Sequence, residues 1–183
     1  MKKERIILNK QLWHSFIALS RYFFRSLIVK RVRGKDFFTE ERYQEFKHRI
    51  EGLNDGTQAK WGTMRVDQML HHVNLSIGSG LGIYQLPDES YFLSRTVIKW
   101  IVINWYSEQP KGLQLPFCLM IPPGAQFDFE AEKLKLLALL DIATTAESQS
   151  QWKPHCYFGK LNVVQWGKLC MIHLDYHLRQ FSA

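Results

Sequence analysis

Two histidines lie four residues apart near the C-terminal end of the sequence, in His173-Leu-Asp-Tyr-His177. In an α-helix, residues four apart project from the same side, one turn above the other. Two such imidazoles can bind one metal ion, because neutral imidazole nitrogen is a common ligand for zinc, nickel, copper and iron. The spacing also fits two core histidines that are each hydrogen-bonded to the protein. A metal site therefore requires a third ligand from elsewhere in the chain.

A helix over residues 163–181 would position this pair, with Asn162 as a good N-cap. When the sequence is projected at about 100° per residue, the apolar side chains gather in one arc and both histidines fall at its edge. That arc contains Val163, Trp166, Cys170, Leu174 and Phe181. The charged residues Lys168, Asp175 and Arg179 fall opposite, so we expect them to face water and both imidazoles to point into the domain.

The stretch from Trp61 to His72 contains a second pair, the adjacent His71 and His72. Thr63 can cap a helix that runs to about Leu81. Its core face consists of Val66, Leu70, Val73 and Ile77. The two histidines lie on either side of that face, so periodicity does not decide which of them points toward a neighbouring helix.

Hydrophobic periodicity predicts four further helices, at residues 9–31, 39–53, 91–106 and 129–144. Thr39 is the expected N-cap of the second. The third is expected to be buried, with a strand over residues 97–105 as the alternative, because that segment is rich in β-branched residues. In the fourth, the side chains expected to face inward are Leu134, Leu137, Ala138 and Leu140. Residues 110–126, which contain four prolines, are expected to form an irregular crossover.

Positive charge is concentrated in one part of the chain of 183 residues, whose net charge is +7. Residues 1–35 contain ten Lys/Arg and one acid, whereas the rest of the chain carries a small net negative charge. The body also shows no aromatic stacking pattern among its basic residues, so we expect no nucleic-acid partner. The hydrophobic content of 46% and the charged content of 22% are those of an ordinary globular protein.

The predicted helix over residues 9–31 is amphipathic and basic, a combination that can lie on a membrane surface. The alternative is that its apolar face packs on its own domain or on a second copy of the chain. Basic residues interrupt its apolar part, so we expect no signal peptide, although the Arg-rich composition also fits an organellar transit peptide. No apolar stretch is long enough to predict a membrane span.

The three cysteines, Cys118, Cys156 and Cys170, show no paired spacing. We expect them to be free thiols in a reducing compartment, and hence a cytoplasmic protein. A buried cysteine that acts as a small hydrophobe is the simpler interpretation of each, and a catalytic cysteine is the alternative.

Four segments together resemble, in order, the DUF1569 family of the DinB-like superfamily of metal-dependent enzymes. They are Trp61-Gly-x-Met-x-Val-x-Gln-Met-Leu-x-His72, Phe127-Asp-Phe-Glu-Ala-Glu-Lys133, His155-x-x-Phe-Gly-x-Leu-x-x-x-x-Trp166 and His173-x-x-x-His177-x-x-Gln-Phe181. The similarity runs from about Phe37 to Phe181 and is weak in motif over residues 83–126. We therefore expect two parts, an N-terminal helical extension over residues 1–36 and a DinB-like domain over residues 37–183.

The resemblance implies an all-α fold, a four-helix bundle with a long crossover, to which the chain adds its N-terminal amphipathic helix. It also implies a divalent metal ion, such as zinc, nickel or iron, held by His72, His173 and His177. His72 is thereby chosen over His71. No catalytic base is identified. Gln68, Gln180 and Tyr176 are candidates for orienting the ligands, and His155 is expected to be structural or to lie at the rim of the site.

Two functional hypotheses follow. The first is a metal-dependent enzyme, a hydrolase or a transferase that uses a low-molecular-weight thiol, acting on a small molecule; members of the superfamily include both thiol-dependent S-transferases and proteins without a known substrate. The second is a non-catalytic protein that uses residues 9–31 to bind a membrane surface or to form a homodimer. The sequence alone does not choose between them.

Overall fold

The computed structural model describes residues 37–105, 109, 111, 116–145 and 151–183. These residues are mainly helical and include no named β-strand, as predicted for the all-α class. The predicted helix over residues 9–31 lies outside them. No helix among the described residues is long and apolar enough to cross a membrane.

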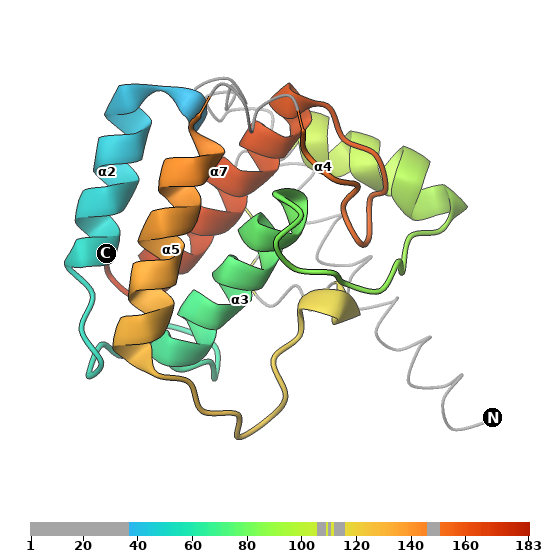
Figure 1. Cartoon of the computed structure of the whole chain (residues 1–183). Coiled ribbons are helices and arrows are strands. Elements are labelled where there is room, and N and C mark those ends of the chain that lie inside the picture. The colour runs from blue at the N-terminus through green and yellow to red at the C-terminus, as the bar shows by residue number, and fades with distance from the viewer. Residues whose placement is uncertain (1–36, 106–108, 110, 112–115, 146–150) are drawn as a thin grey trace, which may run out of the picture.

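Four helices pack around the main hydrophobic core: α2 (Glu40–Glu51), α3 (Val66–Gly80), α5 (Phe129–Ala143) and α7 (Val163–Gln180). Both α5 and α7 contact α2 and α3, and Figure 1 shows the four lying side by side. Trp166 of α7 is fully buried among them, together with Leu70 and Leu136. Each such side chain contributes about 1.5–3 kcal/mol on burial.

Two of the predicted helix starts are confirmed by their caps. Thr39 Oγ1 accepts a hydrogen bond from the backbone of Arg42, and Asn162 Oδ1 accepts one from the backbone of Gln165. Gln165 in turn accepts from the backbone N–H of Asn162, which completes a capping box at the start of α7. This box fixes where α7 begins and therefore the rotation of its two histidines.

The predicted start of the helix that contains His72 is wrong. Thr63 is not its cap, because α3 begins at Val66. The backbone N–H of Arg65 is instead satisfied by the Gln68 side chain, which also donates to the carbonyl of Ala125 at 2.8 Å. The start of α3 therefore depends on a contact with Ala125, which lies some 60 residues away in the sequence.

The predicted inward face of α5 is also partly wrong. Leu140 is buried and Leu137 half-buried as expected, but Leu134 is 65% exposed and Ala138 is exposed. The apolar residues that this helix buries in the core are Phe129, Leu136, Leu139, Leu140 and Ala143. Apolar residues occur around most of α5, so contacts with α2 and α3, rather than periodicity, select the buried side.

Within the segment predicted over residues 91–106, residues 92–105 are helical, not a strand, but they are less buried than predicted. A π-helical turn, η3 (Ser94–Ile98), leads into the short helix α4 (Lys99–Trp105). This segment packs against α7 and stands apart from α2 and α5 (Figure 1). As a result, Val97 is 51% and Trp100 55% exposed.

The prediction that all three cysteines are free thiols is wrong for two of them. Cys118, in the 3-10 turn η4 (Phe117–Leu119), forms a disulfide with Cys156, so these two cysteines are not free thiols. The expectation of a reducing compartment was based on free cysteines, so Cys118 and Cys156 no longer support it. Cys170 is free and buried, and burial raises the pKa of its thiol to about 12.

The predicted charged face of α7 is only partly correct. Lys168, expected to face water, is only 6% exposed. Asp175 and Arg179 are half-buried and form an ion pair with each other.

Candidate metal centre

Three histidines from two helices converge at one point. The Nε2 atom of His173 lies 2.8 Å from Nε2 of His72 and 3.1 Å from Nε2 of His177. The three possible ligand atoms all lie within 4.8 Å of one another, so the cluster could hold one metal ion. The structure therefore brings together the three residues that the resemblance singled out.

The first of the three histidines, His72, is oriented by a backbone carbonyl. Its Nδ1 lies 2.7 Å from the carbonyl oxygen of Leu119, in η4. A carbonyl oxygen only accepts, so Nδ1 must carry the proton and Nε2 must present a lone pair toward the other histidines. Because Cys118 precedes Leu119, the disulfide to Cys156 helps to hold this carbonyl in place.

His177 is oriented in the same way by Gln180. The Gln180 side chain donates from Nε2 to the carbonyl of Trp61 at 2.7 Å, which fixes the orientation of its amide. Its Oε1 therefore faces Nδ1 of His177, at 2.9 Å, and accepts the proton there. Nε2 of His177 is thus also unprotonated, and it points at the same place as that of His72.

His173 lies between the other two rings, with its Nδ1 3.2 Å from the hydroxyl of Ser76. A single N–H on its Nε2 cannot be well aligned with two acceptors, those of His72 and His177, at once. A cation at this point, by contrast, is a partner for three nitrogen lone pairs. Outer hydrogen bonds of this kind, each holding a ring by its second nitrogen, are typical of metal-binding histidines. The donor set fits a divalent metal ion.

Burial keeps these imidazoles in the form that binds metals. Desolvation lowers the pKa of His72, lowers that of His177 to about 3, and with the neighbouring histidines lowers that of His173 well below its usual value. At neutral pH the three rings are therefore uncharged. A protonated imidazole could not act as a ligand, so this environment favours metal binding.

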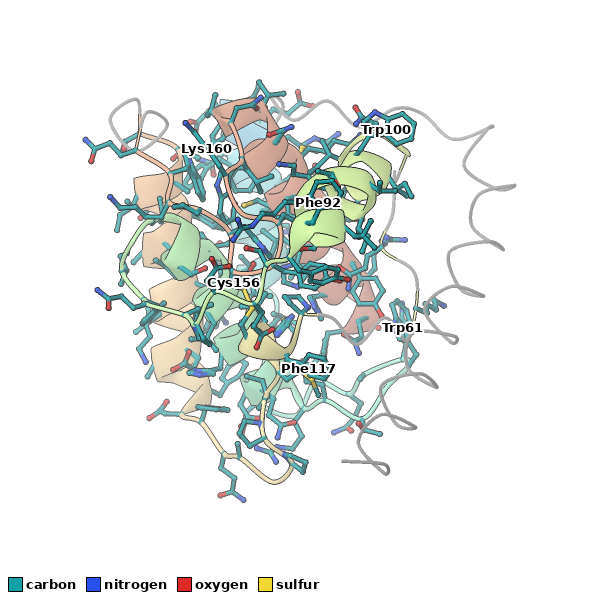
Figure 2. All side chains as sticks on the ribbon, turned by 90° about the vertical axis from the view of Figure 1, so that its right-hand side faces the viewer. Trp61, Phe92, Trp100, Phe117, Cys156 and Lys160 are labelled. Atoms are coloured by element: carbon teal, nitrogen blue, oxygen red, sulfur yellow. A yellow bond between two sulfur atoms is a disulfide. The ribbon has the colours of Figure 1, made fainter. Side chains whose placement is uncertain are left out.

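A large cavity of about 1180 Å³ opens beside the cluster. All three histidines line it, together with Trp61, Tyr176 and apolar side chains of η3 and α4. Figure 2 looks onto this side of the molecule and shows Trp61 on the same face as the exposed Phe92 and Trp100. The candidate site is thus accessible to a ligand rather than sealed in the core.

The remaining predicted residues have other positions. His71 faces away from the cluster: its ring stacks on Phe127, and its Nδ1 lies 3.2 Å from Glu132. His155 is buried, accepts hydrogen bonds from its own turn, and lines the cavity. The Tyr176 hydroxyl accepts a hydrogen bond from the indole of Trp61, and its ring packs edge-on against His177.

Sequence reasoning missed two groups that orient the histidines. Leu119 contributes through its backbone carbonyl, for which its side chain gives no signal. Ser76 follows His72 by one helical turn, so it could have been found as a polar residue on the same side of α3.

The three histidines come from two facing helices, α3 and α7, which is how metal sites in helical proteins are commonly built. The family model DUF1569, described as a protein of unknown function, matches residues 38–183. The chain therefore belongs to the DUF1569 family. Comparisons with curated proteins and with solved structures gave no match.

Proposed function

We propose that this protein is a divalent-metal-dependent enzyme, a hydrolase or a low-molecular-weight-thiol S-transferase, that acts on a small molecule in the cavity. The observation that carries the proposal is the convergence of three Nε2 atoms, each on a ring whose Nδ1 has a protein partner. Three histidine ligands that leave a coordination position open are typical of catalytic rather than structural sites. The arrangement of α2, α3, α5 and α7 as a DinB-like four-helix bundle is part of the same proposal.

His72, His173 and His177 would hold the ion, with zinc, nickel and iron as the candidates. Such an ion supplies a Lewis acid that polarises a substrate oxygen and favours the deprotonated form of water or a thiol. The residues of the chain fix the rings through Leu119, Ser76 and Gln180.

Metal content tests the proposal directly. We expect about one equivalent of Zn²⁺, Ni²⁺ or Fe²⁺ per wild-type chain by elemental analysis, and less than about a tenth in His72→Ala and in the His173→Ala/His177→Ala double variant. His71→Ala is the matched control, because this neighbouring histidine faces Glu132, and it should retain the wild-type amount. Full metal content in the double variant would overturn the proposal.

Turnover is then tested with p-nitrophenyl esters and with a thiol plus an aryl electrophile. Activity that requires the added metal, is retained in His71→Ala and is lost in His72→Ala would support an enzyme. If the protein binds metal but shows neither activity, both the hydrolase and the S-transferase proposals are rejected, and the metal site serves another purpose.

The alternative based on residues 9–31, a membrane-bound or homodimeric protein, depends on residues outside the described part of the chain. It remains a prediction, as do the cytoplasmic location, the absence of a nucleic-acid partner and the division at residues 36 and 37. Flotation with anionic vesicles, comparing the full chain before and after Lys30, Arg31 and Arg33 are changed to Glu, tests the membrane version.

A further inference from the structure

His155 is fixed in one tautomer by the turn that contains it. Its Nδ1 accepts hydrogen bonds from the backbone N–H groups of Tyr157 and Phe158, at 3.0 and 3.2 Å. A ring nitrogen that accepts carries no proton, so the proton of neutral His155 lies on Nε2. The imidazole is thereby a donor at Nε2, and the cross-link at the adjacent Cys156 holds its turn near η4.

This donor belongs to the cavity. His155 is 4% exposed and lines the cavity with the three clustered histidines. Phe158 and Trp166 pack on its ring, with centroids 5.0 and 5.4 Å away. The Nδ1 edge faces the turn, and no acceptor for Nε2–H occurs in the part of the chain that the structure describes. His155 Nε2 is not among the fully buried polar atoms that lack a partner, so its N–H can donate to a ligand oxygen in the cavity.

The charges around the cavity favour an anion. Its described lining contains no Asp or Glu, and its only ionised side chains are those of Arg65 and Lys111. Arg65 is paired with Asp67 through two contacts, of 3.0 and 2.6 Å, which leaves Lys111 as the cation without a carboxylate partner in the lining. Neutral histidines add no negative charge either, so a divalent cation between them would keep its full positive charge.

The rest of the cavity is suited to hydrocarbon. Apolar side chains of η3 and α4, namely Val97, Ile98, Ile101 and Val102, face it from one side, and Leu169 and Ile172 of α7 belong to the same lining. At about 1180 Å³ it is larger than most small-ligand pockets, which measure roughly 300–1,000 Å³. Each methylene buried there raises affinity about fourfold.

We infer that the cavity binds an apolar molecule through a carboxylate, one oxygen of which accepts a hydrogen bond from His155 Nε2–H while the hydrocarbon part lies against η3 and α4. The inference rests on the proposed function, because the other carboxylate oxygen is directed to the cation at His72, His173 and His177. It names the substrate or product class of that site as aliphatic or aromatic carboxylic acids.

Three small probes separate the contributions. Octanoate, octan-1-ol and acetate are titrated into zinc-loaded protein by calorimetry. We expect octanoate to bind at least tenfold more tightly than octan-1-ol, which lacks the charge, and at least a hundredfold more tightly than acetate, which lacks the chain. Equal affinities for octanoate and octan-1-ol would overturn the inference.

The variant His155→Asn tests the donor itself. Its amide oxygen can still accept from the turn, but nothing replaces Nε2–H. Octanoate affinity should fall at least tenfold, while octan-1-ol affinity, zinc content and melting temperature stay near wild-type values. Wild-type octanoate affinity in this variant would refute the role of His155.

A second pair of variants tests the apolar wall and does not depend on the fold of His155→Asn. Ile101→Asn should weaken octanoate and octan-1-ol alike, whereas Leu134→Asn, on the exposed side of α5, should weaken neither. Unchanged octanoate binding in Ile101→Asn would count against the inference. The experiment also distinguishes failure of the metal proposal from failure of this inference. If wild-type protein takes up no zinc, the metal proposal fails, but metal-free His155→Asn should still bind octanoate more weakly than metal-free wild-type protein.

Discussion

Gln180 links a candidate metal ligand to the protein backbone, since its side chain contacts both His177 and the carbonyl of Trp61. Removing such an orienting group typically lowers metal affinity 10–100-fold. We therefore expect Gln180→Ala to raise the dissociation constant for Zn²⁺ by about that factor, measured by competition with a chromophoric chelator. Gln44→Ala, on the exposed surface of α2, is the control. Wild-type affinity in Gln180→Ala would mean that packing alone orients His177.

Glu132 gives the fold a pH dependence away from the metal cluster. Burial acts to raise the pKa of this carboxyl, but hydrogen bonds from Lys135 and Asn74, with the charge of His71, outweigh burial and lower it. Because the pKa is lower in the folded protein, the stabilisation is complete above the unfolded pKa, about 4.3, and is lost as pH falls below it. Glu132→Gln should cost about 1–3 kcal/mol at pH 7, by urea unfolding. That difference should shrink between pH 5 and pH 3; a constant difference would contradict the assignment.

Residue spacing was enough to identify His173 and His177 as a pair, but not to choose His72 over His71. Both flank the core face of α3, and a helical projection contains only the helix itself. Residues far away in the sequence give the two histidines different positions. Phe127 and Glu132 contact His71, whereas the carbonyl of Leu119 contacts His72. Similarity to a family could make the choice because it compares whole sites rather than one helix.

At the scale of elements, α5 offers a matched pair of substitutions. Leu136 is fully buried and Leu134 is 65% exposed, although they lie two residues apart. Leu136→Ala should destabilise the protein by about 2–5 kcal/mol through lost burial and a cavity. Leu134→Ala should change stability by less than about 0.5 kcal/mol. Chemical unfolding of both variants provides the measurement, and a larger loss for Leu134→Ala would mean that the packed face of α5 is misassigned.

The disulfide between Cys118 and Cys156 closes a loop of 38 residues. A loop of this length gives about 4 kcal/mol of stabilisation if the cross-link acts mainly on the unfolded chain. We expect Cys118→Ser/Cys156→Ser to lower the melting temperature and to weaken zinc binding, since the bond lies next to Leu119 and His155. Cys170→Ser, which also removes a sulfur atom, is the comparison for zinc affinity. If zinc affinity is unchanged in the double variant, the cross-link only stabilises the fold.

Elements were predictable where their signals are local. Thr39 and Asn162 cap helices through residues three positions away, and both were found. Thr63 failed as a cap because Gln68 is held by Ala125 across the fold, and the buried side of α5 depends on its neighbours. The pairing of Cys118 with Cys156 likewise requires η4 to meet a turn from another part of the chain, which spacing does not reveal.

For the molecule as a whole, metal binding and folding should be coupled. An ion that binds only the folded chain stabilises it by about 4 kcal/mol at a thousand times its dissociation constant. Adding Zn²⁺ should therefore raise the melting temperature by several degrees, and a chelator should reverse the rise. The His72→Ala variant should show no such response. A similar rise in that variant would indicate that zinc binds elsewhere.

The cross-link beside the histidine cluster has a practical consequence for handling the protein. Dithiothreitol both cleaves disulfides and chelates zinc, so it would remove the disulfide that holds η4 and any zinc bound at the histidines at the same time. A loss of activity in such a sample could then not be assigned to the reduced disulfide or to the removal of zinc. Purification without thiols, followed by separate exposure to a phosphine reductant and to a carboxylate chelator, keeps the two losses apart.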